Sequence, residues 1–292
     1  MAEKAKKKRK KRITALPVLI ALALVLLIFI MVYEGVTARK AAELAAIEAT
    51  ATTPPTETTA ETMPVFTSQR EWAEYMVKQF AEEHGIHHTA YPLTVIEMLE
   101  RDPDTEDYVK DYPIEFGNSY PANLTDEEVG TGVPLFLQWD KRWGYMIYGA
   151  DAAGLTGSGP VCLSMAAVYL TGDKAMSPDY MIQFSIDNGY VTAQSGTAWL
   201  LISEGAGKLG MEATELYRSE TKILEYLGAG DVIICMVGEG HFTDSGQYIV
   251  LAGCQGDMIQ VHDPNSRTNS QRLWDFDEFS DEIKNIWLIR KP

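Results

Sequence analysis

The hydrophobic positions divide the chain into three regions with different periodicities. Residues 13–33 are apolar or uncharged throughout. Between about residues 68 and 228, apolar side chains recur mainly at the three- and four-residue spacing of amphipathic helices. After residue 230 they form short strand-like runs separated by turn residues such as Gly256-Asp257. Helices followed by consecutive strands predict an α+β fold, with N-terminal helices packed on an antiparallel sheet.

The apolar segment 13–33 has the length of a transmembrane helix. At about 1.5 Å per residue it would span roughly 31 Å, close to the thickness of a bilayer core. A cleaved signal peptide is the alternative, but its apolar region is usually only about 7–15 residues long. We therefore predict one uncleaved membrane anchor. The basic residues 1–12 would stay in the cytoplasm and the rest of the chain would be extracytoplasmic.

The remainder divides into a stalk, a helical lead-in and a folded domain. Residues 34–66 are rich in Thr, Pro and Glu in their second half, which is typical of an extended linker. Residues 67–132 are the lead-in, and residues 133–292 are the domain. We expect helices at 68–85, 91–99, 102–113, 159–171, 177–189, 196–209, 220–228 and 276–283. We expect strands at 231–237, 247–254, 258–262 and 285–290.

The charge distribution excludes one class of partner. The chain has a formal net charge of −16, but eight of its 25 basic residues lie in residues 1–12 beside a single acidic one, Glu3. The remaining 17 basic and 40 acidic residues therefore carry a net charge of −23. Such an acidic domain would repel nucleic-acid phosphates, so we predict no nucleic-acid partner.

The cysteines and histidines do not form a metal-binding pattern. Cys162, Cys235 and Cys254 have no CxxC spacing and are odd in number, which argues against a zinc site or a disulfide framework. Buried free thiols are favoured, and a Cys235–Cys254 bridge is the alternative. His87-His88 has no second ligand pair nearby, which favours an exposed loop. We predict neither a metal nor a cofactor.

One stretch has the sequence of a nucleophile site at the start of a helix. A Gly/Pro turn runs directly into an apolar helix, whose free N–H groups and dipole would stabilise an anion. The residue at that point is Ser158. The stretch reads Gly157-Ser158-Gly159-Pro160-Val161-Cys162-Leu163-Ser164-Met165.

Six motifs in order resemble one known family. They are Val133-Pro134-Leu135 with Gln138-Trp139-Asp140-Lys141-Arg142-Trp143-Gly144; Tyr148-Gly149; the stretch containing Ser158; Gly196-Thr197-Ala198-Trp199; Phe242-Thr243 with Gly246-Gln247-Tyr248-Ile249-Val250-Leu251; and Asp263-Pro264-Asn265-Ser266. The span from about Tyr91 to Trp287 resembles the extracellular C39-like cysteine peptidase domain of Gram-positive bacteria, which is papain-like and of the bacteriocin-processing type. This resemblance implies a papain-like cysteine peptidase fold. The segment with Asp111-Tyr112-Pro113 resembles the leader region that often precedes that domain.

The resemblance also implies roles for four positions. In that family a Cys at a helix N-terminus is the nucleophile, a His is the base, an Asp orients the His and a Gln supplies an oxyanion donor. The corresponding positions are Ser158 for the nucleophile, Gln247 for the base, Asp263 for the orienting residue and Gln138 for the oxyanion donor. A serine without a base is a weak nucleophile, and a glutamine cannot accept the proton at neutral pH.

We therefore expect a C39-like domain that has lost peptidase activity, with Ser158 serving as a helix N-cap. It would bind a peptide or a cell-wall-related ligand in the vestigial cleft. Two alternatives stay open. One is an active peptidase or amidase that uses Ser158 or Cys162 with His241 or His262. The other is a structural surface module, which would have a filled and closed cleft around Gln247.

Overall fold

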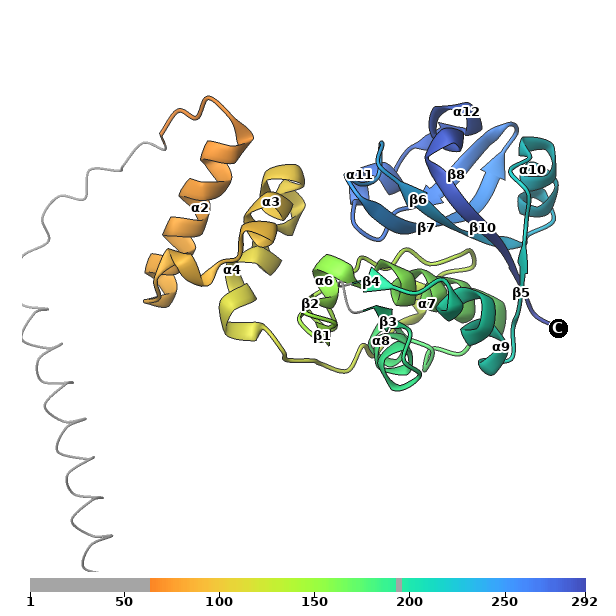
Figure 1. The fold of residues 1–292 in the computed structure, drawn as a ribbon, viewed down its shortest axis with the longest axis horizontal. Helices are drawn as coiled ribbons and strands as arrows, with labels where there is room; N and C mark the ends of the chain where they lie inside the picture. Colours follow the sequence, from red (N-terminus) through yellow and green to blue (C-terminus); the bar gives the residue numbers. More distant parts are fainter. Residues whose placement is uncertain (1–63, 193–195) are drawn as a thin grey trace, which may run out of the picture. The chain divides into compact units, whose positions relative to one another are not determined.

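The structure, a computed structural model, describes residues 64–192 and 196–292 (Figure 1). The predicted cytoplasmic tail, membrane helix and nearly all of the stalk lie outside these ranges. Among the helices within them, none is both long and apolar enough to cross a membrane. Residues 66–292 form one unit, which contains both the predicted lead-in and the predicted domain.

Residues 69–115 of the lead-in fold as three α-helices around their own apolar cluster. The elements are α2 (Gln69–His84), a 3-10 turn (His88–Ala90), α3 (Leu93–Arg101), a second 3-10 turn (Pro103–Thr105) and α4 (Glu106–Glu115). Ser68 caps α2 by accepting a hydrogen bond from the Glu71 N–H, and Gly85 ends the helix at a φ of 64°. The cluster also includes Tyr145 and Ala152, so it joins the lead-in to the following segment.

A helical layer follows α4 and begins within the last residues of the lead-in. A short α5 (Asp126–Val129), two paired strands β1 (Ile147–Tyr148) and β2 (Asp151–Ala152), and α6 (Ala153–Thr156) precede α7. Helix α7 (Ser158–Thr171) is buried over most of its length because it carries almost no polar side chains. Helix α8 (Pro178–Asp187) packs against α7.

The C-terminal part forms a six-stranded antiparallel sheet in the order β5-β10-β6-β7-β8-β9. The strands are β5 (Glu212–Glu215), β6 (Val232–Gly238), β7 (Gly246–Gln255), β8 (Met258–His262), β9 (Leu273–Asp275) and β10 (Ile283–Arg290). The short helices α10 (Glu220–Gly228), α11 (Arg267–Ser270) and α12 (Phe276–Phe279) lie between strands in the sequence, and a 3-10 turn (Ser280–Glu282) leads into β10. The chain is therefore α+β, as predicted.

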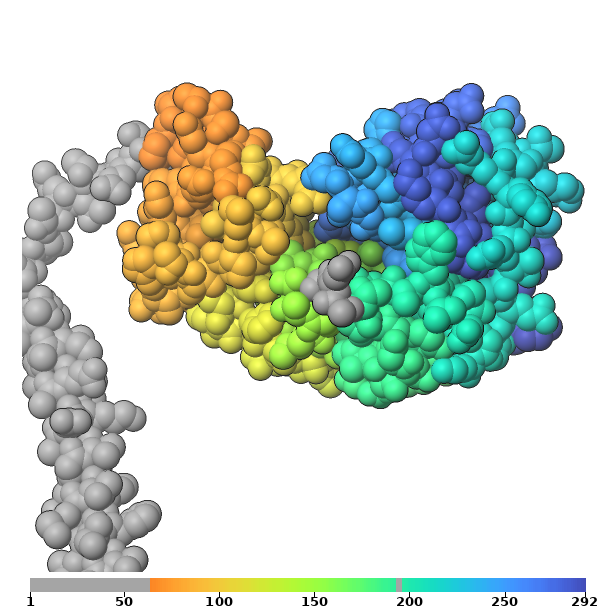
Figure 2. All heavy atoms as spheres, in the orientation of Figure 1, coloured from red at the N-terminus to blue at the C-terminus, as the bar shows by residue number. Residues whose placement is uncertain are grey.

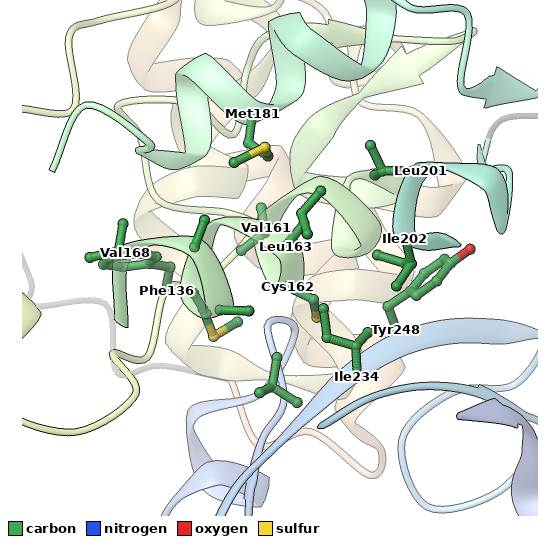
Figure 3. Packing of buried hydrophobic residues seen from close by; sticks show 14 of the residues in the cluster. Phe136, Val161, Cys162, Leu163, Val168, Met181, Leu201, Ile202, Ile234 and Tyr248 are labelled. Carbon is green, nitrogen blue, oxygen red and sulfur yellow. The ribbon is translucent and has the colours of Figure 1, made fainter. Parts of the chain in front are cut away.

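Both faces of this sheet are buried. Ile234 and Val250 face the α7 layer, while their neighbours Ile233 and Leu251 face the cluster that includes α10 and α12. Alternate side chains of β6 and β7 therefore enter different cores, which explains why these strands are continuously apolar in the sequence. Figure 3 shows residues of α7, including Cys162, packed above Ile234 and Tyr248.

Several elements differ from the sequence prediction, and most of them are short, such as β1, β2, β3 (Val191–Thr192), α5, α6 and α11. The segment predicted as a helix at 196–209 begins as a strand, β4 (Gly196–Thr197), which pairs with β3. Only a π-helical turn (Leu201–Gly205) and α9 (Ala206–Lys208) follow it as helix. Strand β5 was missed because its side chains are mostly exposed and carry two glutamates, so it has no apolar run. Strand β9 was missed because it has only three residues.

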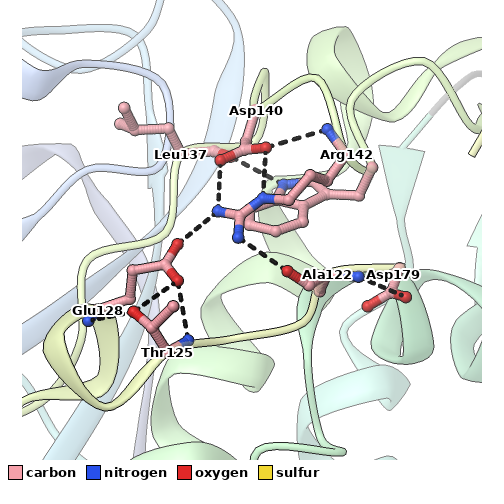
Figure 4. Close-up of polar contacts among 8 residues, drawn as sticks. Ala122, Thr125, Glu128, Leu137, Asp140, Arg142 and Asp179 are labelled. Atoms are coloured by element: carbon pink, nitrogen blue, oxygen red, sulfur yellow. Dashed lines mark hydrogen bonds and ion pairs between the residues drawn. The ribbon is translucent and has the colours of Figure 1, made fainter. Parts of the chain in front are cut away.

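Arg142 holds the segment that leads from α5 to α7 (Figure 4). Its guanidinium donates to both carboxylate oxygens of Asp140, to Glu128 Oε1 at 2.6 Å and to the Ala122 carbonyl at 2.8 Å. It also stacks on the Trp143 ring, 4.6 Å from the centroid. The segment with Gln138 has little regular secondary structure, so these bonds replace a backbone ladder there.

We expect Arg142→Ala to lower the free energy of unfolding by about 2 kcal/mol or more, because it leaves two partly buried carboxylates without their cation. Chemical denaturation measures this loss. Arg218→Ala is the matched control, since Arg218 pairs with the largely exposed Asp281 and should matter much less. Equal losses in the two variants would contradict the role given to Arg142.

Candidate functional site

Ser158 lies at the first position of α7 and faces the start of β7. Its side chain is only 9% exposed, and its Oγ accepts a hydrogen bond from the Tyr248 backbone N–H at 3.2 Å. That N–H is available because β8 pairs with β7 only from Val250 onward. The prediction that Ser158 is the N-cap is wrong: Gly157 occupies that position, and the Ser158 hydroxyl is turned to β7 instead.

Gly159 explains how closely this helix start approaches its neighbour. A Cβ at Gly159 would lie 2.7 Å from the Thr197 side chain, which no real contact allows. Thr197 is itself held by the Tyr148 hydroxyl, at 2.8 Å from its Oγ1. A glycine is therefore needed for the start of α7 to pack this closely against Thr197 of β4.

Gln247 and Asp263 form a buried hydrogen-bonded pair beside Ser158. The register pairs Val250 with His262, which brings the residue after β8 next to the start of β7. Gln247 Nε2 donates to Asp263 Oδ1 at 2.5 Å. Gln247 is 5% exposed and Asp263 is fully buried.

The Asp263 carboxylate is held by more than this one donor. The Asn265 N–H and the Asn269 side-chain amide also donate to it, each at 2.8 Å. Burial nevertheless raises the pKa of Asp263 to about 6, because removing the charge from water outweighs the donors that lower it. Gln247 contributes a neutral amide, which does not titrate.

Gln138 lies on the same cavity wall as Ser158 and Gln247. Its backbone N–H donates to the Pro264 carbonyl at 2.7 Å, and its side-chain Nε2 donates to the Gly154 carbonyl at 2.8 Å. The Gly154 contact fixes which end of the amide is nitrogen. Within the described residues, the buried Gln138 Oε1 has no hydrogen-bond partner.

These residues line a cavity of about 420 Å³ between α3 and the sheet. Figure 2 shows the surface hollowed between the yellow-orange helices and the blue sheet. Asp263 lies behind Gln247 and does not itself line the cavity. The structure thus brings together all four positions predicted from the sequence, while their roles stay predictions.

The sequence analysis missed one wall of this cavity. Thr94, Glu97, Met98 and Arg101 of α3 line it at the i, i+3, i+4, i+7 spacing of a single helix face. Val95 and Leu99 of the same helix face the lead-in core. The polar side chains around Met98 were a signal that this helix has a second face with a role of its own. Nothing in the sequence, however, placed that face opposite β7.

The alternative nucleophile and bases lie elsewhere. Cys162 is fully buried in the core, and burial raises the pKa of its thiol well above the usual value. His241 is exposed and its Nδ1 lies 2.5 Å from Glu282 Oε1. His262 Nδ1 lies 3.2 Å from the Pro134 carbonyl, and burial lowers the pKa of this imidazole. Among the described residues, no histidine lines the cavity with Ser158.

The three cysteines are free thiols. Cys235 of β6 lies opposite Ile249 of β7. Cys254 lies five residues farther along β7 than Ile249. At about 3.3 Å per residue this separates the two by roughly 16 Å, far beyond disulfide geometry. In the described part of the chain, no group of three or more His, Cys, Asp or Glu residues could hold a metal ion.

Comparison with known proteins finds one distant structural similarity. No protein-family model and no curated protein matches the chain. Among solved structures, the chain is similar to the peptidase domain of Streptococcus ComA, a bifunctional ABC transporter involved in a quorum-sensing pathway. The two are 21% identical over 56% of this chain and 100% of that domain, with a TM-score of 0.37. Because this similarity is too low to carry an argument, the interpretation of the site depends on its own geometry.

We expect the buried Asp263 carboxyl to make stability fall as the pH rises. Its pKa is about 6 in the folded chain and about 4 when unfolded, so the unfolded state ionises first. Between about pH 4 and 6, Asp263 should cost the fold up to about 3 kcal/mol. Denaturation of the wild type and of Asp263→Asn across this range measures the effect.

The stability of the wild type relative to Asp263→Asn should decline with rising pH. Loss of hydrogen bonds in the variant shifts the whole curve but adds no slope of its own. A difference that is constant, or that grows with pH, would contradict a raised Asp263 pKa.

Proposed function

We propose that this chain carries a C39-like, papain-like domain without peptidase activity, which binds a peptide or a cell-wall-related ligand in the Ser158 cavity. The observation that carries this proposal is the bond from Gln247 Nε2 to Asp263 Oδ1 beside Ser158. It supports a site with the layout of a nucleophile, a base and an orienting acid. The central position holds a group that cannot accept the proton.

The chemistry available at this site is binding. An acyl transfer through Ser158 needs a base to remove the hydroxyl proton, and the Gln247 amide does not supply one. The cavity still offers the Ser158 hydroxyl and the Gln138 amide as hydrogen-bonding groups. An open cavity of about 420 Å³ at Gln247 favours this function over a structural module with a closed cleft.

The active-hydrolase alternative is less well supported. It requires His241 or His262 to reach Ser158, yet the first pairs with Glu282 and the second with the Pro134 carbonyl. Cys162 would need to ionise inside an apolar core. Each candidate residue is paired or buried elsewhere, which favours a domain without peptidase activity.

Restoring both catalytic residues tests this proposal. We expect Ser158→Cys combined with Gln247→His to react with a thiol-directed peptidase probe at residue 158, because the imidazole would then lie between the thiol and Asp263. Peptide mapping by mass spectrometry locates the adduct. The wild type should carry no adduct at residue 158.

Two matched variants make the result specific. Ser158→Cys combined with Gln255→His places the new imidazole at the exposed end of β7 and should label far more slowly. Adding Asp263→Ala to the restored pair should lower its labelling, since the histidine loses its orienting partner. Equal labelling of the two histidine variants would show that the geometry around Gln247 is not that of a catalytic base.

We also propose that residues 13–33 anchor the chain in the cell membrane with the domain extracytoplasmic. The support is the uncharged apolar segment and the basic residues 1–12. The intact chain should stay in the membrane pellet after an alkaline carbonate wash, and deletion of residues 13–33 should release it. An intact chain that washes off would overturn the anchor.

A further inference from the structure

The Ser158 cavity continues into a second one along the sheet. The second cavity has a volume of about 470 Å³ and shares Met98, Arg101, Thr243 and Asn265 with the first. Helix α3 forms one side of both, and the loop between β6 and β7 forms the other. We call the two cavities together the groove. An elongated groove of this kind suits an extended chain better than a compact small molecule.

Each cavity is lined by a residue with a buried oxygen that has no hydrogen-bond partner in the described part of the chain. In the first cavity it is Oε1 of Gln138, a residue that is only 3% exposed. In the second it is Oδ2 of Asp102, whose other oxygen accepts from the Asp104 N–H at 3.0 Å. Buried polar groups are normally paired, so an unpaired acceptor is a specific reason to expect a donor from a ligand.

The groove also carries an excess of negative charge. Its walls include four carboxylates, and Arg101 is the guanidinium among them. His241 also lines the second cavity, but its ring is paired with Glu282. The carboxylates are those of Glu97, Asp102, Asp151 and Asp244.

We propose that the groove binds an extended peptide that carries a cationic side chain. A backbone N–H of the peptide donates to Gln138 Oε1, and an ammonium or guanidinium group lies between Asp102 and Asp244. This inference depends on the proposed peptide-binding function and adds the charge of the ligand to it.

The physical basis is the cost of burying acceptors without donors. An unpaired buried acceptor destabilises the free protein, and a ligand that supplies the donor recovers part of that loss. A cation is the donor best suited to Asp102, since burial raises the pKa of this carboxyl and a nearby positive charge would favour its ionised form. The net charge of −23 on the rest of the chain also draws cationic peptides toward the surface.

Three fluorescein-labelled peptides that differ only at the centre test the inference. They are Ser-Ala-Leu-Lys-Lys-Leu-Ala-Ser and the same peptide with Gln-Gln or Glu-Glu in place of Lys-Lys. Fluorescence anisotropy measures their affinity for the full chain in a non-ionic detergent at physiological ionic strength. We expect the Lys peptide to bind at least about tenfold more tightly than the Gln peptide, and the Glu peptide to bind most weakly.

A pair of charge-matched variants separates the groove from the overall charge. Asp102→Asn with Asp244→Asn should weaken the Lys peptide about tenfold and leave the Gln peptide within about twofold, which also shows that the variant is folded. Asp187→Asn with Asp257→Asn removes the same charge from exposed positions that do not line the groove. This control should change the Lys-peptide affinity by less than about twofold.

Two outcomes would overturn the inference, and they differ in what they say about the proposed function. If the three peptides bind equally well, or if the control variant binds the Lys peptide as weakly as the groove variant does, the groove has no preference for a cationic side chain. The proposed peptide binding would still stand. If none of the three peptides binds, the proposed peptide-binding function of this site is contradicted as well.

Discussion

The bond between Gln247 and Asp263 is the interaction on which the interpretation of this protein depends. A fully buried carboxylate needs donors, and here a neutral amide supplies one at 2.5 Å. In the function we propose, this amide stands where a histidine base would lie beside a nucleophile. In that proposal, the bond holds Gln247 beside Ser158 and leaves the serine without a group that could accept its proton.

The fold holds this arrangement from several directions. The β7–β8 register sets the distance between Gln247 and Asp263, and the Tyr248 N–H ties β7 to the first residue of α7. Helix α3 then closes the cavity from the side opposite the sheet, so the lead-in is part of the site. The binding function that we propose therefore has a place for specificity in α3, outside the four positions predicted from the sequence.

Much of this could be predicted from the sequence, for identifiable physical reasons. The apolar strands β6 and β7 and the capped helix α2 have strong periodic or capping signals, and the motif order placed Ser158, Gln247 and Asp263 in one site. The prediction that Ser158 is the N-cap was wrong because its hydroxyl accepts a hydrogen bond from the Tyr248 N–H. These two residues are 90 positions apart in the sequence. The α3 wall was missed for the same reason, since only tertiary packing brings it to β7.

The measurement that tests the central claim most directly is intact-protein mass spectrometry of the wild type after exposure to a serine-directed fluorophosphonate. Such a reagent phosphonylates a serine that is activated by a base and positioned beside oxyanion donors. The account predicts no adduct on Ser158 at neutral pH, because Gln247 leaves the hydroxyl without a base. A stoichiometric adduct mapped to Ser158 would contradict it and would show that another group activates this serine.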